Sequence, residues 1–171
     1  GNISDEAIKL IAKTAEGSVR DSISLLDRAL ISQLNEKEKE ISEQDVRGML
    51  GLADKSKIIS LFKEVLIGNE RDALKLLKEL IDDGLDAKNF LNDILEILYF
   101  FSRRVNLGPI ENDMSISETE AKMINEYSKN IDMQDIGLFW QLTIKTIDDL
   151  KTVGNENLTL EMYIMQLVHL N

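Results

Sequence analysis

Apolar residues recur every three or four positions along most of this chain, which is the spacing of an amphipathic α-helix. The pattern predicts longer helices over residues 4–16, 19–32, 70–83, 87–105, 117–130, 133–153 and 157–169. Two further helices are expected to end at Gly51 and Gly68. No period-two alternation is long enough for a strand, and no repeat of roughly 20–50 residues is present. The predicted fold class is therefore all-α.

Short polar residues mark the expected helix starts. Ser4 and Asp132 are good N-caps, because their side-chain oxygens accept a hydrogen bond from a free backbone N–H group. Ser42 and Asp45 have the spacing of a capping box. These signals predict where three helices begin.

Glycines mark the expected helix ends and help to divide the chain. Gly68 and Gly84 follow two neighbouring helical patterns, and the short loops predict an antiparallel helix pair. The boundary of the first domain is expected at the Ala-Asp-Lys run at 53–55. We therefore expect a three-helix domain over residues 1–52 and a helical-bundle domain over residues 53–171.

The helix over 87–105 is the most apolar of the chain. Its second half leaves no polar face, and a helix that is apolar on every side is expected to be buried on every side. Tyr99 and Phe100 lie in this half. The helix also offers more apolar surface than one core needs, so these two aromatic residues are candidates for a subunit interface.

The helix over 133–153 carries two apolar stripes. The stronger one is predicted to face the core, and its members are Ile136, Phe139, Trp140, Ile144, Ile147 and Leu150. Leu138 and Leu142 lie about 200° and 240° around the helix from Ile136, at about 100° per residue. We expect this second stripe either to contact another subunit or to be covered by the last helix.

Composition narrows the functions that the chain can have. The 171 residues include no cysteine and one histidine, which excludes disulfides and thiolate metal sites and argues against a histidine metal site. The net charge of −11 argues against a main nucleic-acid surface, because phosphate binding relies on lysine and arginine. No apolar run reaches the roughly 18 residues of a membrane span. No phosphate loop of the form G-x-x-x-x-G-K-[ST] is present, so we expect no tight ATP binding and no hydrolysis by this chain alone.

One short stretch carries candidate chemistry. Gly17 ends the first helix, and Ser18 and Asp21 form the capping box of the next. Arg20 falls in the first helical turn, where free N–H groups attract phosphate and a cation is disfavoured. Arg20 could contact a phosphate held nearby, although from spacing alone an exposed arginine paired with a local carboxylate is the favoured interpretation.

The residues around Arg20 resemble a known family. The run from 16 to 29, Glu-Gly-Ser-Val-Arg-Asp-Ser-Ile-Ser-Leu-Leu-Asp-Arg-Ala, is similar to the sensor 2 region of the gamma/tau subunits of bacterial DNA polymerase III, the ATPases of the sliding-clamp loader. Ser22 replaces the usual alanine and Arg28 the usual glutamine. Weaker matches follow in order, at 46–51 (Val-Arg-Gly-Met-Leu-Gly) and at Glu161 and Met162.

The resemblance implies a role for each part of the chain. Residues 1–52 would be the lid of an AAA+ ATPase module, with Arg20 contacting the γ-phosphate of ATP and Gly17, Ser18 and Asp21 shaping its turn. Residues 53–171 would be the collar that joins subunits, so the chain would be a piece of a longer protein. The resemblance places ATP, magnesium and a structural zinc in that longer protein and no cofactor in this piece.

The resemblance also implies partners and a location. The partners would be the delta and delta prime subunits and further gamma/tau copies, with the sliding clamp and primer-template DNA bound through other domains. No membrane would be involved, and the location would be cytoplasmic. The alternative is a free-standing helical adaptor for a partner helix, which explains the apolar helices equally well but not the stretch around Arg20. No residues in the sequence support a third interpretation, a small acidic enzyme.

Overall fold

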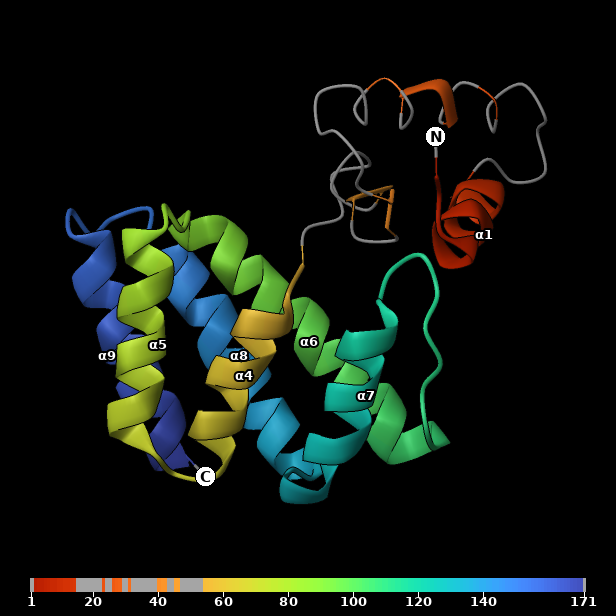
Figure 1. Cartoon of the computed structure of the whole chain (residues 1–171). Coiled ribbons are helices and arrows are strands. Elements are labelled where there is room, and N and C mark those ends of the chain that lie inside the picture. The colour runs from red at the N-terminus through yellow and green to blue at the C-terminus, as the bar shows by residue number, and fades with distance from the viewer. Residues whose placement is uncertain are drawn as a thin grey trace. The chain divides into compact units, whose positions relative to one another are not determined.

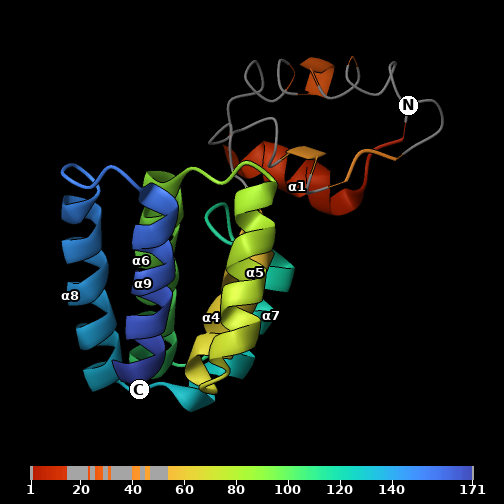
Figure 2. The same cartoon turned by 90° about the vertical axis from the view of Figure 1, so that its left-hand side faces the viewer.

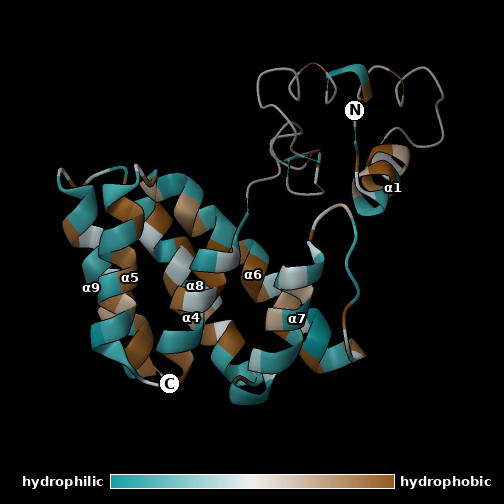
Figure 3. Ribbon diagram, viewed as in Figure 1, coloured by the Kyte–Doolittle hydropathy of each residue, from teal (hydrophilic) through white to brown (hydrophobic). Residues whose placement is uncertain are grey.

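The computed structural model describes residues 2–14, 40–42 and 54–170, together with 23, 26–28, 31, 45 and 46. Within these residues the regular elements are helices, which confirms the predicted all-α class (Figure 1). They are α1 (Asp5–Thr14), α4 (Ser56–Leu66), α5 (Glu70–Asp82), α6 (Ala87–Leu107), α7 (Glu118–Tyr127), a 3-10 turn (Ser128–Asn130), α8 (Met133–Asp149) and α9 (Glu156–Leu170). Hydrophobic and hydrophilic residues alternate along the ribbons, as amphipathic helices require (Figure 3).

The chain divides into two compact units. The first comprises residues 1–54 and 112–118, and the second comprises residues 55–111 and 119–171. The change between units near residue 54 falls beside the Ala-Asp-Lys run at 53–55.

The first unit is organised around α1. The Ser4 hydroxyl oxygen accepts a 3.1 Å hydrogen bond from the Ala7 N–H group, as its predicted capping role requires. Beside it, a short parallel bridge pairs Ile3 with Ile41. The described core of this unit consists of Ala7, Leu10, Ile11, Ile41 and Val46, with Ile3 and Leu26 packed against it.

The predicted capping box of the first unit is also present. The Ser42 hydroxyl accepts from the Asp45 N–H group at 3.2 Å, and the Asp45 carboxylate accepts from the Ser42 N–H group at 2.9 Å. The two bonds satisfy donors that a helix start would otherwise leave free.

The second unit is a helical bundle. In Figure 2, α8 lies at one edge, α6 and α9 lie beside it, and α4 and α5 lie beyond them. Three aromatic rings from three helices meet at its centre: Phe62 of α4 lies 5.6 Å from Phe101 of α6 and 5.6 Å from Phe139 of α8, measured between ring centroids. Edge-on and tilted rings at this separation attract one another in addition to burying apolar area.

Two glycines end helices of this bundle, as the sequence predicts. Gly68 and Gly84 have φ angles of +79° and +93°, a conformation that costs other residues energy. At the first, the Asn69 N–H group bonds the Glu64 carbonyl at 2.9 Å and the Gly68 N–H group bonds the Val65 carbonyl at 3.1 Å. This pair of bonds is a Schellman motif, which satisfies carbonyls at the end of α4.

Candidate assembly surface

The candidate nucleotide-sensing residues are not placed by the structure. Gly17, Ser18, Arg20 and Asp21 lie outside the residues that the structure describes. The geometry on which a functional site can be built therefore belongs to the second unit.

Helix α8 buries a different face from the one predicted. Its buried residues are Ile136, Phe139, Thr143 and Thr146. Trp140 and Ile144, predicted to face the core, are 42% and 46% exposed, so that prediction was wrong. At about 100° per residue, the buried face is rotated by roughly 45° from the predicted stripe.

The two threonines explain the rotation. The Thr143 hydroxyl donates a 2.7 Å hydrogen bond to the Phe139 carbonyl, and the Thr146 hydroxyl donates a 2.8 Å bond to the Leu142 carbonyl. A hydroxyl that bonds the carbonyl four residues earlier has its polarity satisfied within its own helix, so it is buried at little cost. An apolar-periodicity argument counts threonine as polar and misses this possibility.

A hydrogen bond between α8 and α9 fixes the rotation. The Tyr163 hydroxyl oxygen lies 2.7 Å from the Thr143 Oγ1 atom, and the two residues are fully buried. Because Thr143 uses its single hydrogen toward Phe139, the Tyr163 hydroxyl is the donor in this contact. Burial raises the pKa of Tyr163 well above its ordinary value. The phenol is therefore neutral, and α8 cannot rotate without leaving a buried donor unpaired.

The rotation leaves an apolar surface on α6 and α8, which we call the α6/α8 surface. Its most exposed apolar members are Tyr99 (52%), Met133 (41%), Trp140 (42%) and Ile144 (46%). The Met133 sulfur accepts hydrogen bonds from Ser102 at 3.6 Å and from Asn106 at 3.3 Å. Ser102 and Asn106 follow Tyr99 by three and seven residues and so share its helix face. The contact therefore joins the Tyr99 face of α6 to the Met133, Trp140 and Ile144 face of α8.

An open hollow extends this surface along α8. Its lining residues are Trp140, Gln141, Ile144, Lys145, Ile147, Asp148 and Lys151. The polar members of the hollow are two lysines, one glutamine and one aspartate. Its apolar members, Trp140, Ile144 and Ile147, make the hollow suited to contact with another apolar surface.

The predicted interface residues are distributed between surface and core. Leu138 is 41% exposed and Leu142 is half-buried, on the flank of α8 away from Trp140. Tyr99 is exposed, with the Arg103 guanidinium 5.9 Å from its ring centroid. Phe100 is only 5% exposed and belongs to the core, which removes it as an interface candidate. Full burial of α6 was also wrong, because Tyr99 is exposed.

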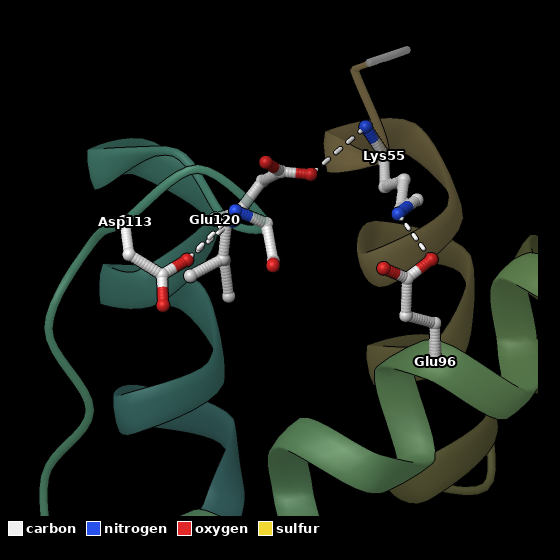
Figure 4. Close-up of polar contacts among 6 residues, drawn as sticks. Lys55, Glu96, Asp113 and Glu120 are labelled. Carbon is white, nitrogen blue, oxygen red and sulfur yellow. Dashed lines mark hydrogen bonds and ion pairs between the residues drawn. The ribbon is translucent and has the colours of Figure 1, made fainter. Parts of the chain in front are cut away.

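A charged cluster fixes the start of α4 in the bundle (Figure 4). The Lys55 N–H group donates a 3.1 Å hydrogen bond to the buried carboxylate of Glu120, and the Lys55 ammonium pairs with Glu96 at 2.5 Å. Burial raises the pKa of Asp93 nearby, Lys55 opposes that rise, and Glu96 and Glu120 add to it. The partners are 41 and 65 residues apart, so no local pattern could have identified them.

The described residues show neither a metal-binding cluster nor a membrane-spanning helix. No group of three or more histidine, cysteine, aspartate or glutamate side chains there is arranged to hold a metal ion. Of the helices in the described part of the chain, none has both the length and the apolar character to cross a membrane.

Two protein families match this chain. Residues 41–171 match the family described as DNA polymerase III subunits gamma and tau domain III. Residues 2–33 match the family described as DNA polymerase III clamp loader subunit, ATPase lid domain.

Individual proteins are similar over most of the chain. DNA polymerase III subunit tau of Escherichia coli (strain K12) is 28% identical over 162 residues, which cover 94% of this chain and 24% of that protein. Subunit gamma of Buchnera aphidicola subsp. Schizaphis graminum is 27% identical, covering 98% of this chain and 45% of that protein. The chain thus spans less than half the length of these two relatives.

A solved structure has a similar fold. The Bacillus subtilis DNA clamp loader delta protein superposes with a TM-score of 0.58 at 12% identity, covering 98% of this chain and 51% of that one. At this identity the similarity concerns the fold alone.

Proposed function

We propose that this chain, which belongs to the family of DNA polymerase III gamma and tau subunits, supplies the lid and the assembly collar of a clamp-loader subunit. In this role the second unit joins neighbouring subunits and carries no reaction step. The α6/α8 surface supports this role. It exposes several large apolar side chains on two adjacent helices, in a domain that matches this family. Tyr99, Leu138 and Leu142 belong to the exposed or half-exposed residues available for such contacts.

We further propose that the partners are the delta and delta prime subunits and additional copies of the same subunit. The complete protein would use ATP with magnesium to load a sliding clamp onto primer-template DNA, in the cytoplasm, and would hold a structural zinc. These activities belong to a longer protein, because the relatives of this chain extend well beyond the matched region.

The assembly role is tested by mixing the purified chain with delta and delta prime and measuring complex mass by gel filtration with light scattering. We expect a complex larger than any single component. Components that elute separately at every concentration up to their solubility limit would contradict the assembly role.

The sensor role of Arg20 is supported by its place within the lid match and is tested in the full-length subunit. Arg20→Ala removes a charge-assisted contact to phosphate, so ATP-dependent clamp loading should fall on the order of 10- to 100-fold. Arg28→Ala is the matched control, because Arg28 is an exposed arginine within the same lid match. Clamp loading at the wild-type rate by Arg20→Ala would exclude the sensor role.

A further inference from the structure

We infer that helix α7 is a coupling element, which holds all three chain connections between the two units and opens together with them as one cooperative segment. The chain passes from one unit to the other after residues 54, 111 and 118. Each connection is fixed to α7 by hydrogen bonds or by the chain itself. The consequence for clamp loading rests on the proposed function, in which α7 is the route by which a movement of the lid reaches the collar.

The first connection is fixed to α7 by Glu120 (Figure 4). The chain enters the second unit at Lys55, whose N–H group donates a 3.1 Å hydrogen bond to the Glu120 carboxylate. Lys55 is the N-cap residue of α4, and in a capping box the third residue of the same helix accepts from this N–H group. That residue of α4 is Ile58, so a carboxylate of α7 supplies the acceptor instead. Because the Glu120 carboxylate is buried, separating it from this donor is costly.

The second connection is fixed to α7 by Asn125. It leaves the second unit after residue 111, one residue beyond Ile110. The Ile110 N–H group donates a 2.9 Å hydrogen bond to the Asn125 Oδ1 atom, and the Asn125 side-chain amide donates a 3.0 Å bond back to the Ile110 carbonyl. The asparagine amide offers a donor and an acceptor side by side, so the two bonds fix both the position and the orientation of the Ile110 backbone.

The third connection runs directly into α7. Residues 112–118 belong to the first unit, and α7 begins at Glu118. The Asp113 carboxylate accepts hydrogen bonds from the N–H groups two and three residues later, at 2.7 and 3.2 Å, which closes a turn just before the helix. Ile116 in this turn is buried, and the chain from there to Glu120 can span at most about 14 Å. The covalent chain therefore has little slack between the first unit and α7.

Helix α7 is held to the bundle less tightly than the other helices are held to one another. Helices α4, α5, α6, α8 and α9 pack closely in pairs, and no such close pair in the described part of the chain includes α7. The buried apolar residues of α7 are one alanine and one isoleucine, Ala121 and Ile124. Segments with few buried apolar contacts open at a lower free energy than the core does. We therefore expect α7 to open while the bundle stays folded.

Native-state hydrogen exchange, followed by NMR over a series of low urea concentrations, tests the coupling in the chain as it stands. The amide protons of Lys55, Ile110 and Ile124 report on the first connection, the second connection and α7 itself. They should share one opening free energy, lower than that of the Phe101 amide in the bundle core. Three different opening free energies, or an Ile124 amide that exchanges only when Phe101 does, would overturn the inference.

The variant Asn125→Ala separates coupling from a set of independent contacts. It removes both bonds to Ile110 and leaves the bond between Lys55 and Glu120 in place. Protection of the Ile110 amide should fall at least about 10-fold, and protection of Lys55 should fall by the same factor because the segment opens as one. A fall at Ile110 alone contradicts the coupling. Glu126→Ala is the matched control, since Glu126 is exposed on the same helix, and it should change protection by no more than about twofold.

The variant Glu120→Gln keeps the test decisive if Asn125→Ala fails to fold. Glutamine keeps an acceptor oxygen for the Lys55 N–H group and loses the charge, so protection should fall at Lys55, Ile110 and Ile124 together. A fall confined to Lys55 would overturn the inference. None of these measurements involves ATP, delta or delta prime. Failure of the coupling therefore leaves assembly with those subunits untouched, and failure of that assembly leaves the exchange pattern untouched.

Discussion

The hydrogen bond between Tyr163 and Thr143 predicts an unequal response to removing its two partners. Tyr163→Phe deletes the donor, and the Thr143 hydroxyl keeps its own bond to the Phe139 carbonyl. The expected loss is that of one neutral hydrogen bond, about 0.5–1.5 kcal/mol of unfolding free energy. Thr143→Val keeps the side-chain shape but leaves a buried phenol hydroxyl without an acceptor, which costs about 1–3 kcal/mol.

The double variant gives the sharper test. In Thr143→Val, adding Tyr163→Phe removes the unpaired donor, so the second substitution should recover part of the lost stability. Two apolar groups of the original shapes then face each other, an exchange that is often close to neutral. The two substitutions should therefore be strongly non-additive, as expected for residues in direct contact.

Urea unfolding followed by the fluorescence of Trp140, the single tryptophan, measures these effects in the second unit. Thr152→Val is the matched control, because the Thr152 hydroxyl also bonds a backbone carbonyl, at 3.2 Å, but is exposed. The assigned donor and acceptor are wrong if Tyr163→Phe costs more than Thr143→Val. They are also wrong if Tyr163→Phe destabilises the Thr143→Val background further.

Two other predictions concern the same unit. The pKa of Asp93 is raised in the folded state, so the contribution of this group to stability is complete below the ordinary carboxyl pKa and is lost as pH rises through the folded value. Asp93→Asn should therefore raise the urea midpoint at pH 7 and change it little near pH 3; equal shifts at both values would contradict the assignment. Gly84→Ala should lower the unfolding free energy by about 1 kcal/mol because its φ is +93°. Gly137→Ala should raise the unfolding free energy by about 1 kcal/mol, since Gly137 lies inside α8 and an added Cβ meets nothing within 4 Å. Thermal melts in which the two alanine variants shift the melting temperature in the same direction would contradict these opposite expectations.

The local features of the fold follow from short stretches of sequence. The all-α class, the caps at Ser4 and Asp132 and the helix ends at Gly68 and Gly84 were all predicted and are all present. Each depends on hydrogen bonds or dihedral angles within about six residues, so neighbouring residue types are sufficient to specify it.

The candidate surface was predictable only in part. The sequence indicated surplus apolar area on α6 and α8 and offered Tyr99 and Leu138 as interface candidates, and both side chains are exposed. It placed Trp140 and Ile144 in the core, whereas both are exposed, and it named Phe100 as an interface candidate, whereas that side chain is buried in the bundle. Periodicity gives the number of apolar residues on a helix but not which arc of the helix its neighbours cover.

Polar groups that meet in the tertiary structure determine which arc of α8 is buried. Thr143 and Thr146 satisfy their hydroxyls on their own helix, and Tyr163 then adds a bond that only one rotation of α8 allows. The cluster of Lys55 with Glu96 and Glu120 likewise joins residues far apart in the chain. The sequence by itself determined where the helices begin and end, because those bonds are local. The tertiary structure decided which face each helix buries, because a buried donor must find its acceptor on another helix.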